Sequence, residues 1–409
     1  MKGWEYQKIG DFSEIGRGSS PRPIIDQAYF VNGNIPWIKI ADATASFKYI
    51  YRTKEYVNEY GASFSRKLSP RTLILAASGT LGFPIFLGVE GCIHDGWLYF
   101  KSIKANVDKQ YLYYCLITFV KSFNSFSYGA AIQNINTDIL RNTKIPLPPL
   151  PIQRKIAAIL SAYDDLIENN SRRVTILEKI AEELYREWFV RLRFPGHDKT
   201  KIVKGVPDGW ELKKLPEIAE ITYGYPFDGS RFNDLGIGKP IIRIRNIPDS
   251  STTDYTDEEA KDKHIVRKGD LLVGMDGEFH INHWFGEEAY LVQRSCRIKS
   301  HDPSLHGYLS KAIVAPVKFY ESILQGATVG HLGAKHLNSI DILIPNSEFK
   351  KYLSVFNNLV EQKVNYSSSI NNLKTSRDRL LSRLISGKVD VENMDIEFPA
   401  SMKEELVHA

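Results

Sequence analysis

Several short stretches of the sequence carry side chains suited to contact a polynucleotide. The stretch Arg17-Gly-Ser-Ser-Pro-Arg22 places two guanidinium groups and the hydroxyls of Ser19 and Ser20 in a small, flexible loop. Such groups bind phosphate oxygens and the edge of guanine. The same stretch would also make an ordinary surface turn, so alone it does not establish a nucleic-acid site.

Other stretches offer groups that fit base edges. Arg243-Ile-Arg-Asn246 alternates cations along an expected strand, and Gln133 with Asn134 supplies amides that can bond to an adenine edge. Tyr223 adds an aromatic ring beside a glycine. Alternating polar residues are equally the solvent face of a half-buried strand, and aromatic rings beside glycine more often pack in a core. These residue types permit nucleic-acid binding without requiring it.

A search of the sequence for catalytic and metal-binding signatures gives little. We find no P-loop, no Gly-x-Gly-x-x-Gly after a strand, no Gly-x-Ser-x-Gly elbow and no Asn/Asp-Pro-Pro-aromatic tetrapeptide of amino-methyltransferases. Pro207-Asp-Gly-Trp-Glu-Leu-Lys213 contains nuclease-like elements, but they are too close in sequence to come from neighbouring strands of one site. His280 and His283 lack a neighbouring cysteine that would complete a zinc site. We therefore expect no catalytic residues and no metal site.

The composition fits a cytoplasmic protein with two cores. The chain has 409 residues, of which 43% are hydrophobic, and no segment is long and apolar enough to span a membrane. The amino terminus has no apolar signal stretch, and the three cysteines lack metal-site spacing.

The charge is unevenly distributed along the chain. Residues 390–409 hold six acidic residues against Lys403, so the rest of the chain carries a net charge of +10, with 52 basic against 42 acidic residues. A basic surplus suits a phosphate backbone, although many basic proteins have no nucleic-acid partner. We expect the acidic tail to be solvated and mobile.

Hydrophobic periodicity predicts two long helices. Residues 151–188 repeat apolar positions in steps of four and three after Ile145-Pro-Leu-Pro-Pro-Leu-Pro151, and residues 352–384 repeat the same rhythm before Gly387. At 1.5 Å per residue, the first helix would be about 60 Å long, more than a compact domain needs for one buried helix. We expect the two helices to form a coiled coil, with an ordinary core helix as the alternative.

The predicted seam of this coiled coil contains Ile156, Leu160, Tyr163, Ile167, Asn170, Val174, Leu177, Leu184 and Trp188 in the first helix, and Phe356, Leu359, Tyr366, Ile370, Leu373, Leu380 and Leu384 in the second. Polar Asn170, Lys363 and Arg377 also fall on these seams. Polar groups there cost stability, and we expect them to fix the register and the choice of partner.

The chain is an internal repeat with a period near 200 residues. Gly3-Trp-Glu5 recurs as Gly209-Trp-Glu211, and Leu73-Ile-Leu-Ala-Ala-Ser-Gly79 parallels Leu271-Leu-Val-Gly-Met-Asp-Gly277. The predicted order is a globular domain at residues 1–150, a helical spacer at 151–197, a second domain at 198–346, a second spacer at 347–389 and the acidic tail at 390–409.

Taken in this order, the motifs resemble the specificity subunits of type I restriction-modification systems. The resemblance covers nearly the whole chain, and its most specific part is the start of the central helix, Pro-Leu-Pro-Pro-Leu-Pro-Ile-Gln-Arg-Lys-Ile. It implies a mixed α/β (α+β) fold with two target-recognition domains, each reading one half of a bipartite target in double-stranded DNA. Two long antiparallel helices would form a coiled coil that sets the spacing of the half-sites.

The resemblance also implies that the chain is not an enzyme and holds no cofactor. Two modification subunits would bring S-adenosylmethionine and methylate adenine, and restriction subunits would add ATP- and Mg²⁺-dependent translocation and cleavage.

Carried over by position, the residues that would contact DNA are Arg17, Ser19, Ser20, Arg22, Lys39, Ser78, Gln133 and Asn134 in the first domain, and Tyr223, Arg243, Arg245, Asn246 and Asp276 in the second. Gly330-His331 stands where the first domain has Gln133-Asn134, so we expect the two domains to read different bases. Two other functions stay open: a self-contained methyltransferase or nuclease with unfamiliar motifs, and a coiled-coil adaptor that does not bind DNA.

Overall fold

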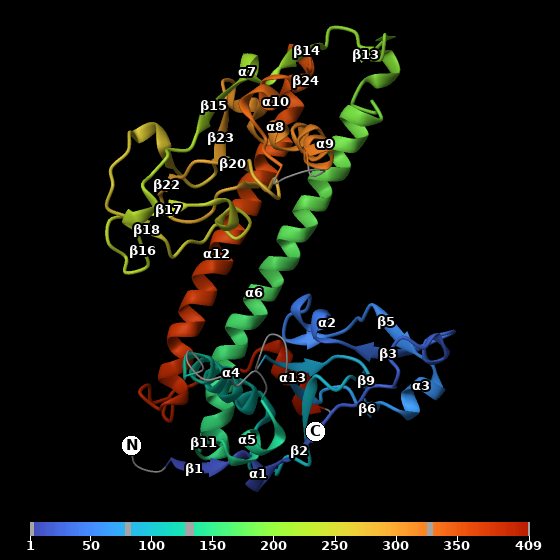
Figure 1. The fold of residues 1–409 in the computed structure, drawn as a ribbon, viewed down its shortest axis with the longest axis vertical. Helices are drawn as coiled ribbons and strands as arrows, with labels where there is room; N and C mark the ends of the chain where they lie inside the picture. The colour runs from blue at the N-terminus through green and yellow to red at the C-terminus, as the bar shows by residue number, and fades with distance from the viewer. Residues whose placement is uncertain (1–3, 78–82, 127–134, 325–329, 408–409) are drawn as a thin grey trace. The chain divides into compact units, whose positions relative to one another are not determined.

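A computed structural model describes residues 4–77, 83–126, 135–324 and 330–407 (Figure 1). The chain divides into two compact units, Met1–Glu168 with Leu373–Ala409, and Asn169–Asn372. The division crosses both long helices, α6 (Leu150–Tyr185) and α12 (Ser354–Ile385). Each unit therefore consists of one globular domain with part of each helix, and the finer domain boundaries stay a prediction.

Domain 1 extends from β1 to β11 and contains two main sheets. The sheet of order β2-β10-β7-β8-β4 comprises Glu14–Arg17, Trp97–Lys101, Leu73–Ala76, Pro84–Leu87 and Tyr49–Ile50. The sheet of order β5-β3-β9-β6 comprises Glu55–Val57, Ile35–Ile38, Gly91–Ile93 and Arg66–Leu68. Strand β1 (Glu5–Lys8) pairs with β11 (Lys144–Leu147). The helices are α1 (Ile9–Phe12), α2 (Ile40–Thr44), α3 (Glu59–Ser63), α4 (Lys109–Phe126) and α5 (Thr137–Asn142).

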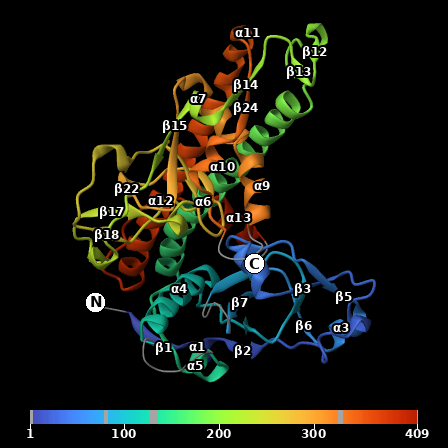
Figure 2. The same cartoon turned by 45° about the horizontal axis from the view of Figure 1, so that its top comes forward.

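Domain 2 extends from β14 to β24 and has the same plan. One sheet, β15-β23-β20-β21, comprises Ala219–Tyr223, Ser295–Ser300, Leu271–Gly274 and Ile281–His283. The other, β16-β18-β17-β22-β19, comprises Phe232–Asn233, Tyr255–Thr256, Lys239–Ile242, Ala289–Leu291 and Ile265–Val266. Strands β14 (Glu211–Lys214) and β24 (Asp341–Ile344) pair side by side (Figure 2). The helices are α7 (Leu215–Ile218), α8 (His306–Ala312), α9 (Val314–Leu324) and α10 (Ala334–Asn338).

The central strands separate two cores because successive side chains point to opposite faces of a sheet. In β7, Leu73 and Leu75 join one buried cluster, whereas Ile74 joins another. In β20, Leu271 and Leu272 divide between two clusters in the same way. Each domain therefore buries both faces of its central strand.

Strand register confirms the internal repeat. Glu5 pairs with Leu147 in domain 1 as Glu211 pairs with Ile344 in domain 2. The parallel pairing of β3 with β9 likewise matches that of β17 with β22. The two domains are copies in hydrogen-bonding pattern as well as in sequence.

Helices α6 and α12 pack antiparallel. In the second unit, Arg173 Nη1 donates to the Tyr366 hydroxyl over 3.0 Å, and Lys363 Nζ lies 2.7 Å from Glu178 Oε1. Partner numbers thus fall along α12 as they rise along α6. In the first unit, Arg377 Nη1 lies 2.7 Å from Asp164 Oδ1, which repeats this register. The predicted mixed α/β fold with two antiparallel helices is confirmed.

Each residue of the predicted seam is buried or half-buried, but α12 also has a second buried face. Val360 and Val364, which lie outside the predicted seam, are at most 9% exposed. A Cβ placed on Gly307 of α8 would lie 2.5 Å from the Phe356 carbonyl oxygen, so this face packs directly on domain 2. The four-three repeat identified the face toward α6 and missed the face toward the domain.

The acidic tail keeps Asp390, Glu392, Asp395 and Glu397 exposed, but some of its apolar residues are packed. Val391 and Met402 are buried in the core of the first unit, and α13 (Ala400–Val407) follows. Lys155 Nζ donates to the carbonyl oxygens of Glu392 and Met394 over 2.6 and 2.8 Å. Apolar residues spaced among the acids anchor the segment, which the charge count did not reveal.

Among the described residues, no helix combines the length and the apolar composition that a membrane crossing requires. Further elements are β12 (Ile202–Val203), β13 (Val206–Pro207), α11 (Ser347–Lys350), a π-helical turn, Arg186–Val190, that ends α6, and several short 3-10 turns.

Candidate nucleic-acid interface

In domain 1, the predicted DNA-binding loop, residues 17–22, lies around one residue, Asp95. Strand β2 ends at Arg17 where β10 begins, and the Gly18 amide donates to the Trp97 carbonyl over 2.9 Å. Ser20 Oγ donates to Asp95 Oδ1 over 3.1 Å, and Arg17 Nε donates to the Asp95 carbonyl over 2.7 Å. Arg22 forms an ion pair with the same carboxylate. We call this end of the sheet the polar edge of domain 1.

The electrostatics of this edge keep Asp95 charged. Partial burial acts to raise the pKa of Asp95, but the hydrogen bond from Ser20 and the charge of Arg22 outweigh it, so the pKa is lowered. The Arg22 side chain stays 69% exposed. Asp95 therefore orients a guanidinium that still faces solvent, as a contact to phosphate or guanine requires.

The other predicted residues of domain 1 lie in different settings. Lys39 pairs with Glu55, and its Nζ lies 4.7 Å from the centre of the Trp37 ring. Ser19 Oγ donates to the Phe64 carbonyl over 2.9 Å. Ser78, Gln133 and Asn134 lie outside the described residues, so their DNA contacts stay predictions.

In domain 2, Arg243 and Arg245 share one carboxylate, that of Asp254. Arg243 Nη1 lies 3.8 Å from Asp254 Oδ2, and Arg245 forms a closer ion pair with it. The arginine side chains are 43% and 60% exposed, against 18% for Asp254. This arrangement again holds exposed cations on a sheltered anion.

Asn246 has a structural role, and its contact with DNA stays a prediction. Its Oδ1 accepts from the Arg243 amide over 2.9 Å, its Nδ2 donates to the Ser251 carbonyl over 2.8 Å, and the residue is 8% exposed. Asp42 makes the matching bond to the Lys39 amide in domain 1, over 2.8 Å. In each domain the polar residue lies three positions after the residue whose amide it caps, which is the spacing of a helix-start cap.

Asp276 lies at the end of β20 and is 13% exposed. Its Oδ2 accepts from Arg294 Nη1 over 2.8 Å, and its Oδ1 pairs with His331 Nδ1. Tyr223, at the end of β15, is half-buried against the core, and this burial raises the pKa of its hydroxyl. We call the end of the sheet formed by Tyr223, Asp276 and Arg294 the polar edge of domain 2.

Comparison with known proteins identifies the family of this chain. The family model for the type I restriction modification DNA specificity domain matches residues 1–179 and 207–372, one match for each repeat. The chain belongs to this family.

Individual relatives agree with this assignment. The chain is 27% identical to the type I restriction enzyme MjaIX specificity subunit of Methanocaldococcus jannaschii, covering 96% of this chain and 95% of the relative. It is 26% identical to the MjaVIII specificity subunit of the same organism, covering 96% and 94%. The crystal structure of a type I restriction-modification S subunit from M. genitalium has the same fold, with a TM-score of 0.61, 15% identity and coverage of 93% and 96%.

Sequence reasoning on this member of the specificity family missed Asp95 and Arg294, and it named His331 only as the residue in place of Asn134. The repeat contained a signal for Asp95 and Arg294. The hydrogen bond from Ala77 N to Gly96 O in domain 1 matches that from Met275 N to Arg294 O in domain 2. His94-Asp-Gly96 and Val292-Gln-Arg294 therefore occupy the same turn, where one domain carries an anion and the other a cation.

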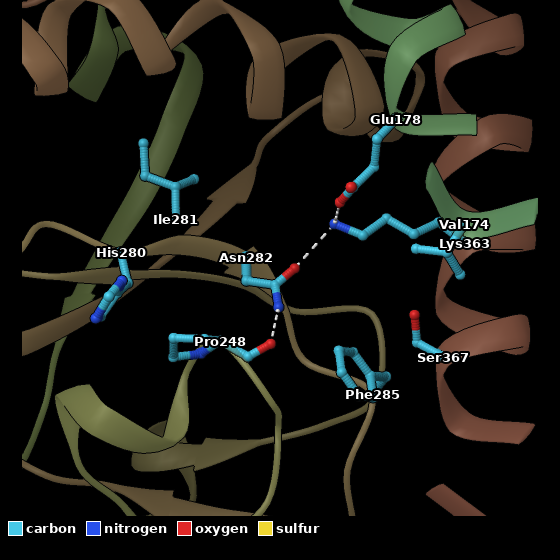
Figure 3. Close-up of a pocket in the computed structure, with 9 residues that line it drawn as sticks. All are labelled: Val174, Glu178, Pro248, His280, Ile281, Asn282, Phe285, Lys363 and Ser367. Carbon is cyan, nitrogen blue, oxygen red and sulfur yellow. Dashed lines mark hydrogen bonds and ion pairs between the residues drawn. The ribbon is translucent and has the colours of Figure 1, made fainter. Parts of the chain in front are cut away.

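Polar networks join the domains of this specificity protein to its helices. Domain 2 and the helix pair line a pocket of about 350 Å³, whose lining residues are drawn in Figure 3. Lys363 Nζ contacts Glu178 of α6 and donates to Asn282 Oδ1 over 3.0 Å, while Asn282 Nδ2 donates to the Pro248 carbonyl over 2.9 Å (Figure 3). This chain of contacts fixes domain 2 on both helices.

A corresponding network serves domain 1. Lys48 Nζ donates to Ser161 Oγ over 2.9 Å, and the Tyr114 hydroxyl donates to Asp164 Oδ2 over 2.5 Å. Asp164 in turn pairs with Arg377 of α12. Among the described residues, no three histidine, cysteine or carboxylate side chains lie close enough to hold a metal ion.

Proposed function

We propose that this chain is the DNA-reading subunit of a type I restriction-modification complex and performs no catalysis itself. One observation carries the proposal. The two repeats present a polar edge at the same end of the same sheet, yet the charged side chains there differ, with Arg22 on Asp95 in domain 1 and Arg294 on Asp276 in domain 2. Repeated scaffolds with different exposed donors suit the reading of two different half-sites in one bipartite target.

The helices would set the distance between the two half-sites in double-stranded DNA. Ion pairs across α6 and α12 oppose sliding of one helix along the other, because sliding would leave sheltered charges without partners. The same geometric link between protein spacing and half-site spacing governs dimeric DNA-binding proteins. The outer faces of the helices would dock two modification subunits.

In this proposal the partners supply the chemistry. The modification subunits would bind S-adenosylmethionine and methylate adenine, and restriction subunits would add ATP- and Mg²⁺-dependent cleavage. The relatives in M. jannaschii are named specificity subunits, and this chain matches them over nearly their full length. Both facts support this division of labour.

The test is to co-express the chain with the modification subunit encoded beside it and map adenine methylation across the host genome. We expect one bipartite motif, methylated on both strands, that disappears when this chain is omitted. An active, bound modification subunit that produces no chain-dependent motif would overturn the proposal and favour a coiled-coil adaptor.

Two further measurements separate the alternatives. S-adenosylmethionine binding by the isolated chain would indicate a self-contained methyltransferase. For the DNA reader, affinity for duplex DNA must fall steeply as salt concentration rises, because phosphate contacts release counterions. An adaptor would show no such affinity.

A further inference from the structure

Arg294 occupies an unusual backbone position on the polar edge of domain 2. It lies in the turn between β22 and β23, and its φ of 68° is in the left-handed region that disfavours residues other than glycine. Its side chain is 66% exposed, so core packing does not account for an arginine at this point. The repeat places Gly96 at the matching position of domain 1.

The surroundings of Arg294 hold its guanidinium in a fixed orientation. Asp276 Oδ2 accepts from Nη1 over 2.8 Å, and Asp276 is itself kept in place by His331 on its other oxygen. The backbone beneath is also tied, with Met275 N donating to Arg294 O over 2.8 Å and Leu332 N donating to Met275 O over 2.7 Å. Three segments distant in sequence thus converge to orient one exposed cation.

The Arg294 side chain is 66% exposed, so its remaining donors are accessible to a ligand. An arginine has five N–H donors, and among the described contacts Asp276 takes one of them. Guanine offers two acceptors, O6 and N7, in the major groove, and the arginine fork matches their geometry. A carboxylate that fixes the fork before binding reduces the entropy lost on contact.

We propose that Arg294 is the specificity-determining side chain of domain 2 and reads a guanine in its half-site, with Asp276 as a positioning residue. This inference rests on the proposed function and adds the identity of one base that domain 2 reads. A Cβ on Gly274 would lie 2.9 Å from Ile244 Cγ2, so the segment that carries Arg243 and Arg245 packs against the end of β20, near Asp276.

The position allows a variant that removes the side chain without harming the backbone. Glycine is the residue that the left-handed region favours, so Arg294→Gly should keep the turn, and His331 still pairs with Asp276, so the domain should stay folded in a thermal-unfolding measurement. Lys204→Gly is the matched control. Lys204 is exposed in the turn between β12 and β13, with a φ of 51°. Its replacement by glycine relieves the same backbone strain at a place away from the polar edge of domain 2. Arg294→Lys keeps the charge and loses the fork.

The experiment maps adenine methylation for each variant co-expressed with the modification subunit. With Arg294→Gly, we expect the motif to relax at one G·C pair in one half, with preference falling on the order of ten- to a hundred-fold. The other half and the spacing stay unchanged. Arg294→Lys should relax the same position less, Asp276→Asn should do so more weakly still, and Lys204→Gly should leave the motif intact.

Three results would overturn the assignment. An unchanged motif in Arg294→Gly would show that Arg294 contacts no base. Methylation weakened equally at all sites, or lost in Arg294→Gly while Arg294→Lys keeps the full motif, means a phosphate contact that reads no base. A relaxed position that is A·T excludes guanine. Failure of the proposed function is distinguishable, because the unaltered chain then yields no chain-dependent motif.

Discussion

Arg377 of α12 and Asp164 of α6 form a sheltered ion pair, with side chains 25% and 11% exposed and 2.7 Å between Nη1 and Oδ1. Burial alone would lower the pKa of Arg377, but the charge of Asp164 outweighs it and raises that pKa. Because Asp164 also accepts from Tyr114 of domain 1, one carboxylate joins both helices to the domain. The pair is thus a structural junction of the first unit.

We predict that Arg377→Met lowers the free energy of unfolding by about 3 kcal/mol, because removing one partner leaves the other charge sheltered and uncompensated. Denaturant unfolding gives the magnitude, and hydrogen exchange at residues 150–168 assigns the loss to the first unit. Arg379→Met changes an exposed residue of the same helix and should cost less than about 0.5 kcal/mol. Equal losses in the two variants would contradict a junction.

Glycine is required where each polar edge begins. A Cβ on Gly224 would lie 2.1 Å from the Val292 carbonyl oxygen, and a Cβ on Gly18 would lie 2.1 Å from the matching His94 oxygen. We predict that Gly224→Ala disrupts the edge and costs about 2 kcal/mol or more, in the range of overpacked sites. Gly229→Ala is the control, because its Cβ would meet no atom within 4 Å. Thermal unfolding compares the two, and similar melting temperatures would refute the requirement.

The stability of the second unit should depend on pH through His283. Burial, followed by the charges of His306, Lys363 and Lys311, lowers the pKa of His283 well below its ordinary value. Its Nε2 has no hydrogen-bond partner among the described residues, so nothing there favours the protonated form.

The sign of this dependence follows from proton uptake. Below about pH 6.5 the unfolded chain binds a proton at this histidine while the folded chain does not, so the free energy of unfolding falls as pH falls. The slope reaches at most about 1.4 kcal/mol per pH unit. Denaturant unfolding between pH 7 and pH 5 should show a shallower slope for His283→Phe. His301→Gln, at an exposed histidine, should keep the slope of the unaltered chain.

The sequence predicted what depends on local periodicity. The four-three rhythm located α6 and α12, and the repeated Gly-Trp-Glu starts located the two domains. It did not predict the polar edges, because Ser20 and Asp95 lie 75 residues apart and Asp276 and His331 lie 55 apart. Nor did it predict that Val391 and Met402 in the acidic tail are buried in the core of the first unit.

The helix pair offers a direct test of how half-site spacing is set. Fourteen residue steps separate Asp164 from Glu178 on α6, and fourteen separate Lys363 from Arg377 on α12. One heptad can therefore be deleted from both helices between the two ion pairs, with both pairs and the antiparallel register retained. Seven residues shorten a helix by about 10 Å, close to the rise of three base pairs.

We predict that the doubly shortened chain, co-expressed with the modification subunit, methylates a motif with the same two half-sites and a spacer about three base pairs shorter. Thr175→Ala changes an exposed residue of the same stretch at constant length and should leave the spacer unchanged. Deleting the heptad from α6 alone should abolish methylation, because one of the two ion pairs can no longer form. If the doubly shortened chain methylates the original spacing, the helices do not determine the distance between half-sites, and the contacts of the modification subunits must do so.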